Sequence, residues 1–512
     1  MNQKISQIGL ALAVVILVGF DGLALAQERV VSAERTNRYL GVPSCSAVAC
    51  HGSDVAADGI IAHSFRIWNN DPHAGAFRVL YGDRSQKIWT NYRATLPDAE
   101  LQPKYAYESR ACIVCHADPP GTSIPKSQLA VTGSDLQTRM SYGVGCESCH
   151  GPARDWISAH ATSAWQNPSI WTADRKEAAG FQNTEDLVTR ARMCASCHVG
   201  DDSREVNHDL IAAGHPRLFF ELASYHERYP AHWDRSKDQR KYVDRSEFEG
   251  SLSRGDIARA STLKAELWRI GQLVSAESTA RLTAHRAGNP DAPWPEFSEY
   301  NCYSCHQDLL NPEGSLLKPG STGQPQWGTW SGVLATELPL ASDETIALRS
   351  ELADKMSSFV VRRGTGAEVG RLADEYATML ETAASQPLAK AEIAALMDHL
   401  SQDETLNRLA SGDPNWELTA QLYLAAAALR TGPTLYTPEQ WIASRDSLRS
   451  ARSILAFRTP SIYLGSRRQA TSPVSFRPRD AEIVLENLRS AAPAPLGDPE
   501  VIRRRSPPGP TL

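Results

Sequence analysis

Four short motifs share one arrangement, in which two cysteines are separated by two residues and a histidine directly follows the second cysteine. They are CIVCH (Cys112, Cys115 and His116), CESCH (Cys146, Cys149 and His150), CASCH (Cys194, Cys197 and His198) and CYSCH (Cys302, Cys305 and His306). Two thiols at this spacing can form thioethers to one edge of a porphyrin, while the adjacent imidazole binds the iron. Zinc sites and redox dithiols also use paired cysteines, but neither requires histidine after the second cysteine in every motif. The pattern therefore predicts four covalently attached haems.

A fifth motif, CSAVACH, has four residues between Cys45 and Cys50 and is completed by His51. Its two cysteines are the only ones of the ten that lie outside the four regular motifs. The longer loop can bulge away from a porphyrin while both sulfurs still reach it. A Cys45–Cys50 disulfide is the alternative, because an exported protein folds in an oxidising compartment. We interpret the motif as a fifth haem c site with His51 as its proximal ligand.

Each haem iron takes a proximal histidine from its motif and can accept a second, distal ligand. Of the 14 histidines five stand in the motifs, which leaves nine (14 − 5) for that role. The distal candidates are His73, His160, His208, His215 and His232. Asp71 as N-cap and Pro72 at the first helical position predict a helix start that would hold His73 rigidly. His160 is expected on a short helix that begins near Pro152.

Two of these candidates, His208 and His215, are seven residues apart and would share a face if they lay on one helix. The glycine and the proline that flank His215 predict instead that this helix ends at His215 and that a new one begins there. His226 competes with His232 for the last distal position. The other histidines are interpreted as surface or internally hydrogen-bonded residues, namely His63, His285 and His399.

The first 26 residues have the features of a secretory signal peptide. Lys4 lies near the start, residues 8–20 are apolar, and small residues provide a cleavage site before Gln27. An uncleaved anchor is the alternative, although the apolar run is short for a bilayer. No later segment is apolar enough to cross a membrane. We therefore expect a periplasmic protein with a cleaved signal peptide and no transmembrane segment in the mature chain.

The motifs are unevenly distributed along the chain. Four of the five fall between Cys45 and His198, so little protein is available for each porphyrin and the haems must form much of the core. We predict a mainly α fold, with a pentahaem cytochrome c domain over residues 27–312 that includes a helix from about 259 to 287. Residues 313–332, rich in Pro, Gly and Ser, are expected to be a linker. Residues 333–490 show helical periodicity without a haem motif, and residues 491–512 are expected to be a disordered tail.

Several segments together resemble the multihaem cytochromes related to cytochrome c-554. The resemblance rests on the clustered motifs and on DPHAGAFRVL, GVGCESCHGPARDWISAH and VNHDLIAAGHPRL, and it extends over residues 39–310. It implies a mostly helical periplasmic protein that relays electrons, with stacked haem pairs and largely bis-histidine irons. It supports the five motif histidines, and it also supports His73 and His160 as ligands. Cytochrome c-554 is a much shorter tetrahaem protein, so the fifth haem and the C-terminal region depart from the family pattern.

Two functions are compatible with this pattern. The first is electron transfer between periplasmic or membrane-bound redox proteins, one acting as donor and the other as acceptor. The alternative is a multihaem oxidoreductase that acts on nitrite, hydroxylamine or a sulfur oxyanion at one open haem iron. Pentahaem nitrite reductases usually carry a CxxCK catalytic motif, which is absent here, so the carrier is favoured. A formal net charge of −6 gives no electrostatic case for binding nucleic acid.

Overall fold

The protein is helical. The computed structural model describes residues 38–54, 60–118, 140–243, 251–290, 294–302, 325–338, 341–358, 366–388, 390–402, 404–405, 416–430, 438–456 and 478–492. Within these ranges the only β pairings are two isolated bridges, Asp201 with Arg204 and Tyr300 with Trp327. The mainly α prediction is therefore confirmed. The predicted signal peptide lies outside the described residues, as do Cys305, His306 and most of the predicted tail.

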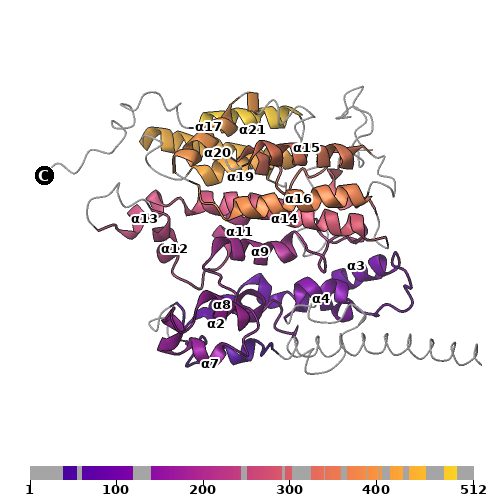
Figure 1. Ribbon diagram of the computed structural model, residues 1–512, viewed down its shortest axis with the longest axis vertical. Helices are drawn as coiled ribbons and strands as arrows, with labels where there is room; N and C mark the ends of the chain where they lie inside the picture. Colours follow the sequence, from indigo (N-terminus) through magenta and orange to yellow (C-terminus); the bar gives the residue numbers. More distant parts are fainter. Residues whose placement is uncertain are drawn as a thin grey trace, which may run out of the picture. The chain divides into compact units, whose positions relative to one another are not determined.

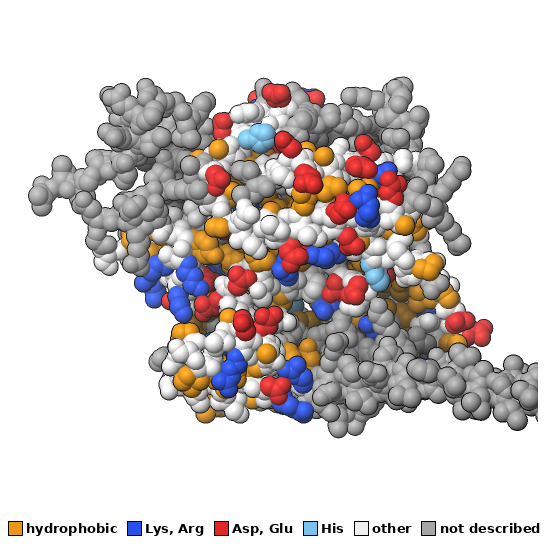
Figure 2. Space-filling view, viewed as in Figure 1, with side chains coloured by type: hydrophobic (Ala, Val, Ile, Leu, Met, Phe, Trp, Pro, Cys, Tyr) orange, Lys and Arg blue, Asp and Glu red, His pale blue; other side chains and the backbone are white. Residues whose placement is uncertain are grey.

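The chain divides into two compact units. Unit 1 comprises residues up to Thr189 together with Ala212–Gly214, and unit 2 comprises Arg190–Ile211 and the residues from His215 onward. The first three motifs belong to unit 1, and the fourth and fifth belong to unit 2. Among the described residues no helix combines the length and apolarity needed to cross a membrane. Lys and Arg side chains are interspersed with Asp and Glu on the face drawn in Figure 2.

Unit 1 is built from short helices joined by turns (Figure 1). They are η1 (Val42–Ser44), α2 (Ser64–Asn69), η3 (Pro72–Gly75), η4 (Arg78–Tyr81), α3 (Asp83–Arg93), η5 (Ala106–Glu108), α4 (Arg110–His116), α6 (Cys146–His150), α7 (Ile157–His160), η7 (Ser163–Gln166) and α8 (Ala173–Ala178). The protein core here is made of small clusters, such as Trp156 and Trp165 with Phe181 packed against them. Short helices bury little apolar surface of their own, so the fold depends on what the connecting turns and motif side chains contact.

Unit 2 contains longer helices. They are α9 (Leu187–His198, which starts at the unit boundary), α10 (His208–Ala212), α11 (Leu222–Arg228), α12 (Arg235–Lys241), α13 (Arg254–Ala260), α14 (Leu263–Gly288), η9 (Phe297–Glu299), η12 (Ala335–Glu337), α15 (Asp343–Ser357), α16 (Gly366–Ala384), α17 (Lys390–Ser401), α19 (Trp416–Leu429), α20 (Pro438–Leu455) and α21 (Pro478–Ala491). Helix α14 is central: it runs alongside α16 and also packs against α11 and α19 (Figure 1). The helix expected over 259–287 is thus present as α14, preceded by a break after α13.

Helix α14 is buried on nearly all sides, so its polar side chains need internal partners. Arg269 is 1% exposed and pairs with Glu266 at 2.9 Å. Its guanidinium also donates to the carbonyls of Ala383 and Ala384, the last residues of α16, at 3.2 and 3.3 Å. A cation at the carboxyl end of a helix satisfies carbonyls that lack intrahelical partners. Helices α14 and α16 are therefore joined by this buried arginine as well as by apolar packing.

Candidate haem-binding sites

The first motif forms a tight turn. Its first cysteine, Cys45, is the C-cap of η1, and the backbone N–H of Cys50 donates to the Ala47 carbonyl at 2.9 Å. A side chain at Gly52 would meet the Ser46 carbonyl oxygen at 2.0 Å, so only glycine allows the chain to fold back here. Cys45 and Cys50 are not joined in a disulfide. The extra residues of this motif are thus accommodated as a compact loop between the two thiols.

The motif histidine His51 lies opposite His160, the last residue of α7. Their ring centroids are 6.2 Å apart, with ring planes inclined by 24°. Face-to-face contact would require atoms at about 3.5–4.0 Å. Two metal–nitrogen bonds of about 2 Å plus two ring radii give roughly 6 Å, the separation expected for one metal ion held between two imidazoles. The structure therefore brings a predicted proximal ligand, His51, and a predicted distal candidate, His160, into a spacing that fits one metal ion.

Both rings are also oriented by hydrogen bonds. The Nδ1–H of His51 donates to the Ile61 carbonyl at 2.9 Å, and the Nδ1–H of His160 donates to the Ile157 carbonyl. A metal-binding histidine typically uses its second ring nitrogen in this way, which fixes the tautomer with Nε2 as the ligand atom. His160 also packs edge-on against the buried Trp156, at 5.4 Å between ring centroids. Helix α7 begins at Ile157 rather than near Pro152, but it presents His160 as expected.

The second motif occupies α4, which ends at His116. The Nδ1–H of His116 donates to the Ala76 carbonyl at 2.9 Å, the same arrangement as in the first motif. Burial lowers the pKa of His116, which favours the neutral form that a metal ligand requires. Burial also raises the pKa of the Cys112 thiol to about 12. The second motif thus presents an oriented, neutral histidine close to its two cysteines.

The third motif lies close to the first. Cys45 accepts a hydrogen bond from Cys146, and this bond lowers the pKa of the Cys45 thiol to about 7. Two buried carboxyl groups, Asp118 and Glu147, lie beside these thiols. Burial raises the pKa of Asp118 to about 8, and the Glu147 charge contributes. One cysteine of the first motif and one of the third are therefore in contact.

The predicted distal ligand His73 is held on η3 as the sequence indicates. Asp71 is the N-cap and accepts the backbone N–H of His73 at 2.8 Å, with Pro72 at the first helical position. The helix is a single 3₁₀ turn, and the Nδ1–H of His73 also donates to Asp71 at 2.5 Å. Gly143, three residues before the third motif, has a φ of +70°, and a side chain there would meet the His73 carbonyl oxygen at 2.4 Å. The close approach fixes His73 near the third motif, and its pairing with a particular iron remains a prediction.

The fourth motif ends α9 in unit 2. The His198 ring packs against Phe220 and Tyr225, at centroid distances of 5.3 and 5.2 Å. Arg204 donates to the Sγ of Cys197 at 3.2 Å and to Ser196 Oγ at 2.7 Å. Only Cys302 of the fifth motif is described, and Arg217 donates to its Sγ at 3.3 Å. These two arginines could not be predicted from the sequence, because no local pattern connects them with the cysteines they contact.

The prediction that a helix ends at His215 was wrong. Helix α10 runs from His208 to Ala212, and the next helix, α11, begins only at Leu222. Gly214 has a φ of +114°, and the backbone N–H of His215 donates to the Leu210 carbonyl at 3.1 Å, which closes the helix end. His208 is the first residue of α10, and its ring lies 5.9 Å from Phe297, which precedes the fifth motif. His208 and His215 therefore do not share a helical face.

His226 is engaged by an arginine rather than poised as a ligand. Its Nε2 accepts a hydrogen bond from Arg190 at 2.8 Å, and Arg190 also pairs with Asp238 at 3.2 Å. Burial and the neighbouring Arg190 charge lower the pKa of His226 to about 4. His232 lies nearby, with its ring 5.3 Å from that of Trp233. Between the two competing histidines the structure favours His232, and its role as a distal ligand remains a prediction.

The three histidines interpreted as non-ligands lie apart from the motifs or have other partners. The Nδ1–H of His63 donates to the Ser53 carbonyl at 2.7 Å. His285 is exposed on α14. His399 on α17 pairs through Nε2 with Glu337 at 2.9 Å. These contacts fit surface or internally hydrogen-bonded roles.

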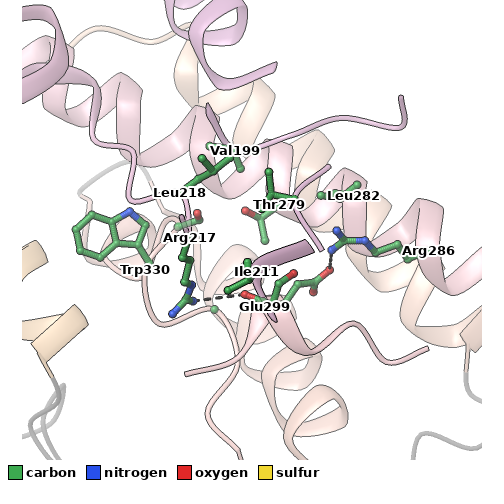
Figure 3. Close-up of a pocket in the computed structure, with 13 residues that line it drawn as sticks. Val199, Ile211, Arg217, Leu218, Thr279, Leu282, Arg286, Glu299 and Trp330 are labelled. Carbon is green, nitrogen blue, oxygen red and sulfur yellow. Dashed lines mark hydrogen bonds and ion pairs between the residues drawn. The ribbon is translucent and has the colours of Figure 1, made fainter. Parts of the chain in front are cut away.

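A pocket in unit 2 borders the fourth and fifth motifs (Figure 3). It contains about 610 Å³ of empty space, part of it open to solvent. Its walls include Val199, which follows His198, and Glu299, which precedes Cys302 by three residues. Arg217 and Arg286 also line it, and Arg286 pairs with Glu299 at 2.5 Å. The pocket therefore combines apolar walls with two fixed cations, of which Arg217 also contacts Cys302.

Cysteine-histidine motifs of this kind on a helical scaffold are typical of c-type cytochromes, a class that binds haem c covalently and transfers electrons through it. Residues 44–151, which contain the first three motifs, match the family model described as cytochrome c554 and c-prime. The chain is thus related to the cytochrome c-554 family through this segment. No curated protein and no solved structure matches the chain.

Proposed function

We propose that the protein is a periplasmic cytochrome that relays electrons between a redox donor and a redox acceptor through five covalently attached haems. The observation that carries the proposal is the His51–His160 pair, in which two imidazoles with oriented Nδ1–H groups face one another at a centroid distance of 6.2 Å. Bound haem supplies one-electron exchange between ferric and ferrous iron. An iron held by two protein nitrogens has no position left for a substrate, which suits a carrier.

The residues of the chain have distinct tasks in such a relay. The ten cysteines would hold the haems, and the five motif histidines would be their proximal ligands. His73, His160, His208, His215 and His232 are the proposed distal ligands. Carbonyls that accept from Nδ1–H groups would fix the tautomer and the ring orientation of the imidazoles, as for His51 and His116. The Cys45–Cys146 contact brings two haem sites together, and short separations between haems favour electron exchange.

The proposed organisation follows the sequence. Residues 1–26 would direct export and be removed, residues 27–312 would carry the haems, and residues 313–332 would connect them to the haem-free helices of 333–490, with 491–512 as a tail. Within the predicted linker, Trp327 and Trp330 are buried in unit 2. The partners would be periplasmic or membrane-bound redox proteins.

The test begins with the oxidised holoprotein. Intact-mass analysis and peptide mapping count the haems and show which cysteines carry them. Electron paramagnetic resonance is then combined with a carbon monoxide titration of the reduced protein. We expect five haems, all low-spin, and no carbon monoxide binding. A high-spin haem that takes up carbon monoxide would contradict the relay and favour an oxidoreductase, which substrate assays with nitrite, hydroxylamine and sulfur oxyanions would then examine.

A further inference from the structure

The haem-free helix α19 reaches the fifth motif through a buried ion pair. Glu417, in the first turn of α19, pairs with Arg217, and the Nη1 of Arg217 also donates to the Sγ of Cys302 at 3.3 Å. The side chains of Glu417 and Arg217 are 2% and 13% exposed. The Nη2 of Arg217 donates to the Tyr300 carbonyl at 3.2 Å, so the guanidinium is also held by the backbone that leads into Cys302. The arginine is fixed at the attachment sulfur by a residue 200 positions away in sequence.

Other contacts from α19 hold the same region. The second carboxylate oxygen of Glu417 accepts from Thr329 Oγ1, and Gln421, one turn further along, donates to the Trp330 carbonyl at 3.0 Å. The rings of Trp416 and Trp330 stack at 5.7 Å with an 8° inclination. Polar side chains of α19 thus form hydrogen bonds with Thr329 and Trp330, close to Cys302. A helix that served only to fill space would not need two buried polar side chains directed at one site.

The fourth motif provides a natural comparison. Arg204 donates to Cys197 Sγ at 3.2 Å, as Arg217 does to Cys302, but its counter-ion is the nearby Asp201 at 3.4 Å. That arrangement is completed within a single loop and is more exposed, with side-chain exposures of 17% and 32%. The fifth motif uses the same arginine-to-sulfur contact, but it takes the counter-ion from the C-terminal helices. Because of this difference, we assign helix α19 a role at the fifth motif, where it supplies the counter-ion of Arg217.

We propose that the C-terminal helical region contributes to the fifth haem site. Glu417 positions Arg217, and the pair sets the reduction potential of that haem. The inference rests on the proposed attachment of haem at Cys302. The guanidinium contacts the sulfur while the carboxylate contacts the guanidinium, so the positive charge is the nearer of the two. A nearby positive charge stabilises the less positive, ferrous state and raises the potential, and the effect is large where water is excluded.

The test uses full-length holoprotein and a spectroelectrochemical titration that resolves the haem potentials. Arg217→Gln removes the charge and is expected to lower the potential of one haem. Glu417→Gln keeps the shape of the side chain but leaves the arginine without its counter-ion, so the reduction potential of the same haem is expected to rise. Arg217→Lys retains the charge and is expected to restore most of the wild-type potential. Arg204→Gln is the matched control and is expected to lower the reduction potential of a different haem.

If the reduction potential of a single haem shifts in opposite directions in the two variants, the role is electrostatic. Damage to the fold would instead change the potentials of several haems, or shift one potential in the same direction in both variants. If the reduction potential shifts equally in Arg217→Gln and Glu417→Gln, or does not shift in either variant, the inference is overturned. Haem counting by mass and peptide mapping accompanies each variant. A wild-type protein without haem on Cys302 would instead refute the proposed fifth haem site itself. Haem counting therefore distinguishes failure of that site from failure of the proposed effect of Arg217 and Glu417 on its potential.

Discussion

The Glu147 carboxylate accepts the backbone N–H of Gly41 at 2.6 Å, although the residues are 106 positions apart. It also accepts the N–H groups of Leu40 at 3.0 Å and Ala153 at 2.7 Å, and Glu147 is 2% exposed. Glu147 stands inside the third motif, while Gly41 leads into the first. One buried carboxylate therefore holds together the chain segments of two cysteine-histidine motifs that also touch through Cys45 and Cys146.

Replacing Glu147 by alanine is expected to destabilise the holoprotein by about 3 kcal/mol or more, because each buried N–H left without an acceptor costs about 1–3 kcal/mol. Urea denaturation followed by circular dichroism measures the loss. Glu177→Ala on the exposed surface of α8 is the control and is expected to change stability by less than about 0.5 kcal/mol. Similar denaturation midpoints for the two variants would show that Glu147 does not carry this connection.

Replacing His160 by alanine is expected to open one haem iron. Because His51 and His160 are spaced for one metal ion, removing one imidazole should give a single high-spin haem that binds carbon monoxide, while the haem count is unchanged. Electron paramagnetic resonance and a carbon monoxide titration measure this, and added imidazole should restore the low-spin signal. His285→Ala, on the exposed face of α14, should leave both measurements at wild-type values. A fully low-spin His160→Ala protein would exclude the pairing.

Features set by neighbouring residues could be predicted from the sequence. The placement of His73 after Asp71 and Pro72 follows from the hydrogen bonds of a helix start, and the structure confirms it. The proline after His215 predicts a new helix start, which places the expected end of α10 three residues after the observed end at Ala212. The structure instead closes the helix with a bond from His215 back to Leu210, and Gly214 adopts the positive φ this requires.

Features that depend on distant contacts could not be predicted. Arg217 and Glu417 are ordinary charged residues in sequence, and only the tertiary fold brings them to Cys302. Glu147 occupies a variable position of its motif, where spacing alone gives no reason for a carboxylate. Trp327 and Trp330 lie in a segment whose composition indicates a linker, yet they are buried against unit 2 helices. Burial of this kind depends on the facing surface, which local periodicity does not reveal.

Acidification is expected to destabilise the protein through His226. Burial and Arg190 lower the pKa of His226 to about 4, whereas the pKa of a histidine in the unfolded chain is 6.5. Because the folded-state pKa is depressed, the stabilisation is present above about pH 6.5 and is lost as pH falls toward 4, by at most about 3 kcal/mol. His226→Gln can still accept from Arg190 but does not titrate. Urea denaturation from pH 7 to 4 should show a smaller loss of stability in this variant, and equal losses would contradict the assignment.

The buried pair of Arg286 and Glu299 should be far more sensitive to mutation than an exposed pair. Both side chains are 4% exposed, and Glu299 also accepts from Thr283 and Trp327, each at 2.7 Å. Replacing Arg286 by methionine leaves a buried carboxylate without its counter-ion, which typically costs about 3–5 kcal/mol. The control is Arg371→Met, which breaks the Arg371–Glu375 pair at 58% and 50% exposure and should leave the denaturation midpoint close to that of the wild type.

Urea denaturation of the holoprotein measures both losses. A double variant, Arg286→Met with Glu299→Gln, removes the uncompensated charge but keeps an oxygen acceptor for Thr283 and Trp327. It should recover part of the stability lost in Arg286→Met, because the cost arises from the stranded charge rather than from lost packing. If the double variant were as unstable as the single one, the arginine would act mainly through its packing against α14 neighbours and the walls of the adjoining pocket.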